Sequence, residues 1–204
     1  YHRKFDVEKL MWEFNLMLDY YVDAFCDSPL DTSAKKELSE VFTPLCESLA
    51  AEKLYFTHRD YHSRNLMCDQ GHLVLIDFQD ARMGPCQYDL VSLLKDSYVK
   101  INDTLVEELI DYYIFLKEKE EGQEVDRERF GNIFDKMSIQ RNLKAVGTFA
   151  YQSVKKNNNR YEGFIAPTLG YVRKVLRCRF KDSSLQKVLS KHIPGLGQIE
   201  EIDL

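Results

Sequence analysis

The chain has 204 residues, a hydrophobic content of 44% and a formal net charge of −5, which is typical of a globular protein with one sizeable core or two small ones. This acidic balance, without a dense run of lysine and arginine, argues against a nucleic-acid-binding protein, because such a protein must neutralise phosphate charges. No apolar stretch approaches the ~20 residues that span a bilayer, so the sequence also argues against a membrane protein.

The five cysteines are an odd number, lack Cys-x-x-Cys spacing and occur in a chain too long to need disulfide staples. We therefore expect reduced thiols. Because the sequence also shows no charged-then-apolar signal segment, a cytoplasmic protein is expected.

Apolar residues recur at helical spacing from Phe5 to Cys26 and predict a first amphipathic helix. Ser28-Pro29 ends this helix, and Asp31 to Ser33 offers a cap for a second helix that runs to about Lys53. Pro44 is expected to kink or divide the second helix, because proline lacks the backbone N–H of the helical ladder.

The second half of the sequence is predicted to be helical almost throughout. Apolar periodicity indicates five further helices, over Tyr88–Lys100, Thr104–Glu120, Ile133–Tyr151, Pro167–Phe180 and Leu185–Leu189. A charged linker over residues 117–129 and a polar turn over residues 155–160 interrupt them, and a polar tail is expected from about residue 192 to residue 204. The predicted fold is mainly α, a single domain over residues 1–204 with one small β element.

That β element is predicted between the second and third helices. Two short apolar runs, residues 66–68 and 73–76, flank a Gln70-Gly71 turn and indicate an antiparallel hairpin. If these two residues form the loop, counting outward along the strands places Asn65 next to Asp77 at the open end.

This open end is a candidate magnesium site. Opposed strand residues lie about 4.5 to 5.5 Å apart, so the amide of Asn65 and the carboxylate of Asp77 can reach one cation. Mg²⁺ takes oxygen ligands and needs only one or two from the protein. Asp60, on the loop that enters the hairpin, is expected to face the same ion from the acceptor side.

The sequence here matches the order that kinases use for phosphoryl transfer: His58-Arg59-Asp60, four further residues, Asn65, and later Asp77-Phe78. Zinc binding by His58 and His62 is a weaker interpretation, because their spacing needs a helix. Arg59 and Arg64 could be solvated or could pair with nearby carboxylates, and for Arg64 a role near ATP phosphates is an equal alternative.

A wider resemblance is carried by His58 to Asn65, Ile76 to Ala81, Gly84-Pro85 and Tyr88-Asp89-Leu90. In these segments the chain resembles the aminoglycoside phosphotransferase-like kinases, a family of small-molecule relatives of the protein kinases that includes choline kinases. The phrases FQDARMGPCQYDLVSLLKDSYV and IQRNLKAVGTFA are similar to the bacterial members that phosphorylate the anomeric hydroxyl of N-acetylmuramate or N-acetylglucosamine in cell-wall recycling.

The resemblance implies the C-terminal lobe of a protein-kinase-like fold, a helical bundle with a small β-hairpin that carries the catalytic and metal residues. Carried over residue by residue, it makes Asp60 the catalytic carboxylate, and Asn65 and Asp77 the ligands of Mg²⁺. It makes Asp89 and His58 structural residues that brace the catalytic loop.

Contacts to the acceptor or to phosphate are less defined, and the candidates are Arg64, His62 and Arg141. Arg141 belongs to a segment, Gln140 to Lys144, whose polar groups could line a sugar pocket. A solvated helix face is the favoured interpretation of that segment.

Two departures from the protein kinases favour a small-molecule acceptor over a peptide. Gln79 replaces the glycine of Asp-Phe-Gly, and the segment between Asp77 and Tyr88 is too short to hold a peptide. A kinase also needs a glycine-rich loop and a strand lysine from an N-terminal lobe to bind ATP, whereas the first glycine here is Gly71. We therefore expect the C-terminal lobe of a longer protein, with its own N-terminal lobe as partner and little activity alone.

The predicted function is transfer of the γ-phosphoryl group of ATP, with Mg²⁺, to a hydroxyl of a small molecule, in the first place an amino sugar. A choline-like or aminoglycoside acceptor is an alternative. So are a catalytically inactive kinase-like binding module and a metal-dependent hydrolase that uses the same carboxylates.

Overall fold

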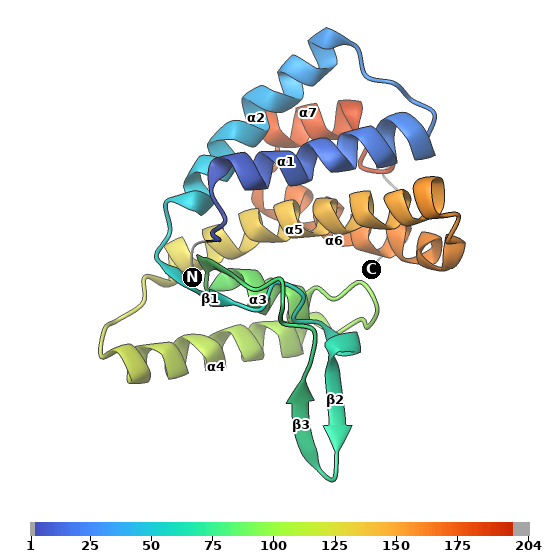
Figure 1. Ribbon diagram of the computed structural model, residues 1–204. Coiled ribbons are helices and arrows are strands. Elements are labelled where there is room, and N and C mark those ends of the chain that lie inside the picture. The colour runs from blue at the N-terminus through green and yellow to red at the C-terminus, as the bar shows by residue number, and fades with distance from the viewer. Residues whose placement is uncertain (1–2, 198–204) are drawn as a thin grey trace.

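The computed structural model describes residues 3–197 and shows a mainly helical body with two small antiparallel sheets among these residues. One sheet is a hairpin that projects from the helical body (Figure 1). The mainly α fold expected from the sequence is therefore confirmed. Among the described residues, no helix has the length and apolar character needed to cross a membrane.

The first two helices lie where the sequence predicts them. Helix α1 (Val7–Met17) begins at Asp6, whose carboxylate accepts a hydrogen bond from the Lys9 N–H at 2.9 Å, and it continues directly into the π-helix η1 (Leu18–Phe25). Helix α2 (Thr32–Ala50) is capped in the same way by Asp31. Pro44 lies inside α2 without dividing it.

The later helices differ from prediction mainly in their ends. They are α3 (Gln87–Leu94), α4 (Asp103–Glu121), α5 (Arg127–Lys156), α6 (Ile165–Arg179) and α7 (Ser184–His192). Helix α3 ends well before Lys100, and α5 extends beyond both ends of its predicted range, so most of the expected charged linker is helical. The expected polar turn after α5 includes the start of a 3₁₀-helix, η3 (Asn159–Phe164).

The predicted hairpin is confirmed in position and register. Strands β2 (Leu66–Asp69) and β3 (His72–Leu75) are antiparallel, and Asp69 pairs with His72 across the turn. Gln70 and Gly71 have φ values of 48° and 82°, the left-handed pair that a type I′ turn requires.

A second sheet was not predicted. Strand β1 (Leu54–Thr57) pairs antiparallel with β4 (Arg82–Pro85). This pairing holds together the two ends of the segment between them, residues 58–81. The N-terminal segment adds to β4, because the Phe5 N–H donates to the Met83 carbonyl oxygen at 2.9 Å. Phe5 itself is buried and stacks on Tyr88, with 4.3 Å between the ring centroids.

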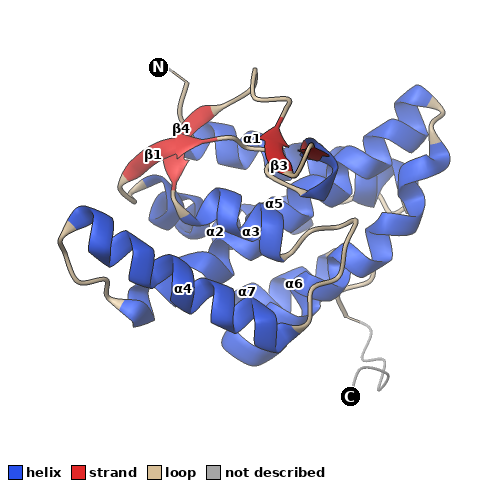
Figure 2. Ribbon diagram, turned by 90° about the horizontal axis from the view of Figure 1, so that it is seen from below, coloured by secondary structure: helices blue, strands red, loops and turns tan. Residues whose placement is uncertain are grey.

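Helix α5 runs through the middle of the body and packs against α1, η1, α3 and α6 (Figures 1 and 2). Its close approach to the first helix depends on Gly147, because a Cβ there would lie 2.6 Å from the Met17 Cα. Buried apolar side chains along α5 belong to the main core, including Ile139, Leu143, Val146 and Ala150.

The expected polar tail is wrong for the residues directly after α7. Ile193 and Leu196 are buried in the core, the Tyr21 hydroxyl donates to the Pro194 carbonyl oxygen at 3.0 Å, and Arg173 donates to the Gly195 carbonyl oxygen at 2.8 Å. The rest of the expected tail, residues 198–204, lies outside the described residues.

Replacing Gly147 with alanine is expected to lower the free energy of unfolding by about 1–3 kcal/mol, because the added methyl group must push α5 away from the Met17 backbone. Chemical denaturation of the full-length protein measures this. Gly163→Ala is the matched control, since a Cβ at Gly163 has no atom within 4 Å. Equal stability of the two variants would contradict the packing argument.

Candidate active site

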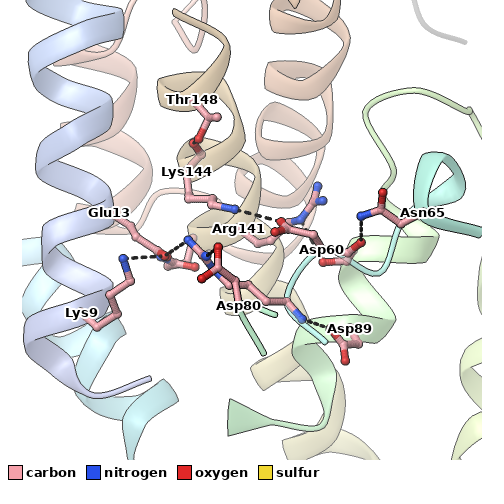
Figure 3. Close-up of polar contacts among 12 residues, drawn as sticks. Lys9, Glu13, Asp60, Asn65, Asp80, Asp89, Arg141, Lys144 and Thr148 are labelled. Carbon is pink, nitrogen blue, oxygen red and sulfur yellow. Dashed lines mark hydrogen bonds and ion pairs between the residues drawn. The ribbon is translucent and has the colours of Figure 1, made fainter. Parts of the chain in front are cut away.

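The segment between β1 and β4 brings Asp60 and Asn65 together. Asn65 ends a short 3₁₀-turn, η2 (Ser63–Asn65), and its side-chain N–H donates to the Asp60 carbonyl oxygen at 2.9 Å (Figure 3). The Ile76 N–H donates to the Asn65 carbonyl oxygen at 3.1 Å, which extends the hairpin ladder beyond β2 and β3. Asn65 therefore lies opposite Ile76, and Asp77 is the next residue along the chain.

Asp77 has a left-handed backbone, with φ at 69°, and its carboxylate is exposed. The Gln79 amide donates a hydrogen bond to Asp77 Oδ1, so the residue that replaces glycine after Asp-Phe is tied to this carboxylate. The carboxylate of Asp77 and the amide of Asn65 are hard oxygen donors of the kind that Mg²⁺ selects. Among residues 3–197, no cluster of three or more His, Cys, Asp or Glu side chains could hold a metal ion.

Asp89 lies at the start of α3, and its side chain binds backbone N–H groups of the loop before Asp60. One carboxylate oxygen accepts from the His58 N–H at 2.6 Å and the other from the Arg59 N–H at 2.9 Å. Arg59 has a φ of 80°, which is costly for a side chain of this size. Burial raises the pKa of Asp89, and the two backbone hydrogen bonds partly offset this effect. The Asp89 carboxylate thus stabilises the left-handed turn that aims Asp60.

His58 ties the same loop to the hairpin. The side chain is buried, and its Nε2 lies 3.0 Å from the carbonyl oxygen of Ile76. With the proton on Nε2, the imidazole donates to that oxygen. His58 therefore links the residues before Asp60 to the residue that precedes Asp77.

A second buried carboxylate, Asp96, supports the loop after Asp60 and was not identified from the sequence. It accepts from the Ser63 N–H and from the Tyr98 N–H, both at 2.8 Å. Sequence periodicity placed Asp96 inside a helix that was expected to reach Lys100. In the structure α3 has already ended at Leu94, and this frees Asp96 to bind backbone amides of two loops. An aspartate within that apolar pattern was the available signal.

The polar residues 140–142 of α5 are buried, so the favoured interpretation of a solvated helix face is wrong. Gln140 and Asn142 are 0% exposed and Arg141 is 4% exposed. Arg141 Nε donates to Ser92 Oγ at 3.0 Å. Lys144 Nζ lies 3.3 Å from Asp60 Oδ1 (Figure 3). This last contact was not predicted, because the two residues are far apart in the sequence.

Charges around Asp60 keep its carboxylate ionised. Burial raises the pKa of Asp60, but the cations of Lys144, Arg59 and Arg141 together lower it further, so its pKa lies below the ordinary value. Burial, with Arg141 as the next cause, lowers the pKa of His62. At neutral pH the site thus combines a charged Asp60 with a neutral His62.

Arg59 is paired with carboxylates rather than solvated. Its guanidinium lies 3.2 Å from Asp80 and 3.7 Å from Glu13 of α1. Glu13 is buried and also binds Lys9 and accepts a hydrogen bond from Gln140 of α5 at 3.0 Å. Arg59 therefore connects α1, the loop of Asp60 and the segment that follows Asp77.

Arg64 points in a different direction from these ion pairs. Its guanidinium lies over the Tyr98 ring, 3.7 Å from the centroid, and 5.0 Å from that of Phe164. Among the described residues it forms no ion pair. His62 also contacts Tyr98, with 5.2 Å between ring centroids. Arg64 and His62 thus flank one aromatic ring beside the loop of Asp60.

The described residues thus form a mainly helical body in which the motif residues Asp60, Asn65 and Asp77 lie on one hairpin and its entry loop. The family model described as "Phosphotransferase enzyme family" matches residues 9–125. The chain belongs to this family.

Curated relatives include proteins named N-acetylmuramate/N-acetylglucosamine kinase. The protein of Neisseria meningitidis serogroup B is 32% identical over 176 residues, which cover 85% of this chain and 52% of the relative. The protein of Pseudomonas putida is 29% identical, with 92% and 56% covered, and that of Pseudomonas aeruginosa is 28% identical, with 91% and 55% covered. The chain spans about half the length of the curated relatives it matches.

Asp89→Ala is expected to lower the free energy of unfolding by about 2–4 kcal/mol, because it removes a charged acceptor from two backbone N–H groups. Urea unfolding of the full-length protein measures this. Asp111→Ala is the control, since Asp111 pairs with Arg127 on the surface and should change stability by less than about 1 kcal/mol. Similar losses in both variants would contradict the bracing role.

The lowered pKa of Asp60 predicts a pH dependence of stability. Because the folded-state pKa lies below the unfolded one, the ionised carboxylate adds stability above the unfolded pKa, and this is lost as pH falls through the folded pKa. Asp60→Asn should therefore be less stable than the wild type at neutral pH, and the difference should shrink in acid. Unfolding midpoints of both proteins between about pH 7 and pH 3 measure it. A pH-independent difference would refute the assignment.

Proposed function

We propose that the full-length protein is an ATP-dependent kinase of a small-molecule hydroxyl, and that this chain supplies its metal and acceptor side. The observation that carries the proposal is the ionised Asp60, whose backbone accepts a hydrogen bond from the Asn65 side chain, in a chain of the phosphotransferase family. Phosphoryl transfer asks the protein mainly for positioning and charge stabilisation, and these are what such a constellation offers.

In this mechanism Asp60 accepts a hydrogen bond from the acceptor hydroxyl and aims its oxygen at the γ-phosphorus of ATP. With a lowered pKa, Asp60 is a weak base before transfer, so it orients the hydroxyl first and takes the proton as the new O–P bond forms. Asn65 and Asp77 are the residues that would hold Mg²⁺, which when bound neutralises phosphate charge.

An amino sugar is the acceptor we propose, since the names of the curated relatives specify N-acetylmuramate and N-acetylglucosamine. Arg64, His62 and Arg141 are its proposed contacts, or contacts of the phosphates. Two of them have donors or acceptors without a partner among the described residues, the NH1 of Arg141 and the Nδ1 of His62. Buried polar atoms of this kind need a water or a ligand.

A further lobe that binds ATP is part of the proposal. The hairpin leaves large apolar side chains exposed on both strands and just beyond them, namely Met67, Leu73, Val74, Leu75, Ile76 and Phe78. Contiguous exposed apolar surface favours an interaction site. The coverage of about half of each relative is consistent with a second lobe that packs on this hairpin.

Two other classes of function have less support. An inactive kinase-like binding module does not need Asp60, Asn65 and Asp77 together, and a metal-dependent hydrolase does not need a nucleotide. Choline-like and aminoglycoside acceptors are other substrates for the same chemistry.

The test is ADP release by the full-length protein with Mg²⁺ and ATP, in the presence of N-acetylmuramate, N-acetylglucosamine, choline or an aminoglycoside. We expect ADP release only with the amino sugars and its loss on metal chelation. Asp60→Ala should lower the rate by about 10²–10⁴-fold. Asp69→Ala, at the exposed end of the hairpin, should keep it.

Each other outcome has a defined meaning. No ADP release with any acceptor supports the binding module, and product formation without ATP supports the hydrolase. If Asp60→Ala retains more than about a hundredth of the wild-type rate, Asp60 is not the catalytic carboxylate.

A further inference from the structure

Lys144 contacts Asp60 from a part of the chain that carries none of the motif residues. Lys144 Nζ lies 3.3 Å from Asp60 Oδ1, and the exposed fractions of the two side chains are 14% and 29%. The contact is therefore largely shielded from water, where an ion pair is stronger than on the surface. Among the described residues, this is the only hydrogen bond or ion pair of the Asp60 carboxylate.

The position of Lys144 is set by the packing of α5 on both sides of it. One turn earlier, Arg141 is buried and donates to Ser92. One turn later, Gly147 lies against the Met17 backbone. Because the turns on both sides are fixed, the aliphatic part of the Lys144 side chain has little freedom, and its ammonium group lies against the Asp60 carboxylate (Figure 3).

The backbone of Asp60 is also held, so only its side chain can still rotate. Its carbonyl oxygen accepts from the Asn65 side chain at 2.9 Å and from the His62 N–H at 3.0 Å. The neighbouring cation, Arg59, is engaged by Glu13 and Asp80. Lys144 is thus the group that selects the direction of the Asp60 carboxylate.

We propose that Lys144 is a positioning residue for phosphoryl transfer, which binds Oδ1 of Asp60 and so presents Oδ2 to the acceptor hydroxyl. This rests on the proposed kinase function. In the transfer, the acceptor oxygen forms a bond to the γ-phosphorus and the bond from that phosphorus to the β–γ bridging oxygen breaks. ADP keeps the electron pair, and the hydroxyl proton passes to Asp60 Oδ2. Lys144 stays protonated throughout and touches no reacting atom.

The first test is steady-state kinetics of the full-length protein carrying Lys144→Met. We expect kcat to fall about 10- to 100-fold, as for a small misplacement of a catalytic group, while KM for ATP stays within about twofold. Lys144→Arg keeps the charge and should recover part of the lost rate. Lys155→Met is the matched control on the same helix, because Lys155 is exposed, and it should match the wild type. A wild-type kcat for Lys144→Met would overturn the proposal.

A double-mutant cycle with Asp60→Ala then separates action through Asp60 from a general effect on the fold. If Lys144 works through Asp60, Lys144→Met should cost nothing further in kcat once Asp60 is alanine. Equal fold losses in both backgrounds would overturn the proposal.

Unfolding midpoints of the same four proteins give a readout that needs no activity. The two substitutions should be non-additive if the ion pair exists in solution, and additive midpoints would refute the pairing. Lys144→Gln replaces Lys144→Met if the latter does not fold. A wild-type protein that phosphorylates no acceptor would refute the proposed function, whereas an active wild type with an unaffected Lys144→Met would refute only this inference.

Discussion

Two backbone N–H groups, those of His58 and Arg59, point at one carboxylate, and the rest of the site depends on that arrangement. Asp89 can accept both because it stands at the start of α3, and β4 leads directly into that helix. The ladder of β1 and β4 places the loop over Asp89, and the carboxylate in turn stabilises a left-handed Arg59. Without this support the turn before Asp60 would relax to a commoner backbone conformation.

Two further carboxylates also bind the loop around Asp60. Asp96 holds the backbone after Asp60, and Glu13 holds the Arg59 side chain from α1. The three carboxylates come from different parts of the chain but bind the same loop, so the loop is tied to α1, to α3 and to the segment after α3. Burying charges is costly unless they are paired. We therefore infer that the buried carboxylates behind Asp60 serve to fix the position of its loop and do not serve stability alone.

Local patterns were sufficient to predict most of the helices and the hairpin. Asp31 and the apolar period after it indicated α2, and Gln70-Gly71 indicated the turn and hence the register of β2 and β3. These features depend on neighbours within a few residues. The end of α3 could not be predicted in this way, because Asp96 leaves the helical pattern to bind Ser63, a partner in another part of the chain.

By itself, the sequence determined which residues belong to one hairpin and its entry loop. Asp60, Asn65 and Asp77 are near each other along the chain, and the two-residue turn fixes a register that places Asn65 opposite Ile76, the residue before Asp77. Only the tertiary structure decided what faces Asp60 from outside this segment. Periodicity cannot distinguish a polar helix face in solvent from one buried on distant partners, so the burial of Arg141 and the contact of Lys144 with Asp60 follow from the packing of α5 and not from its pattern.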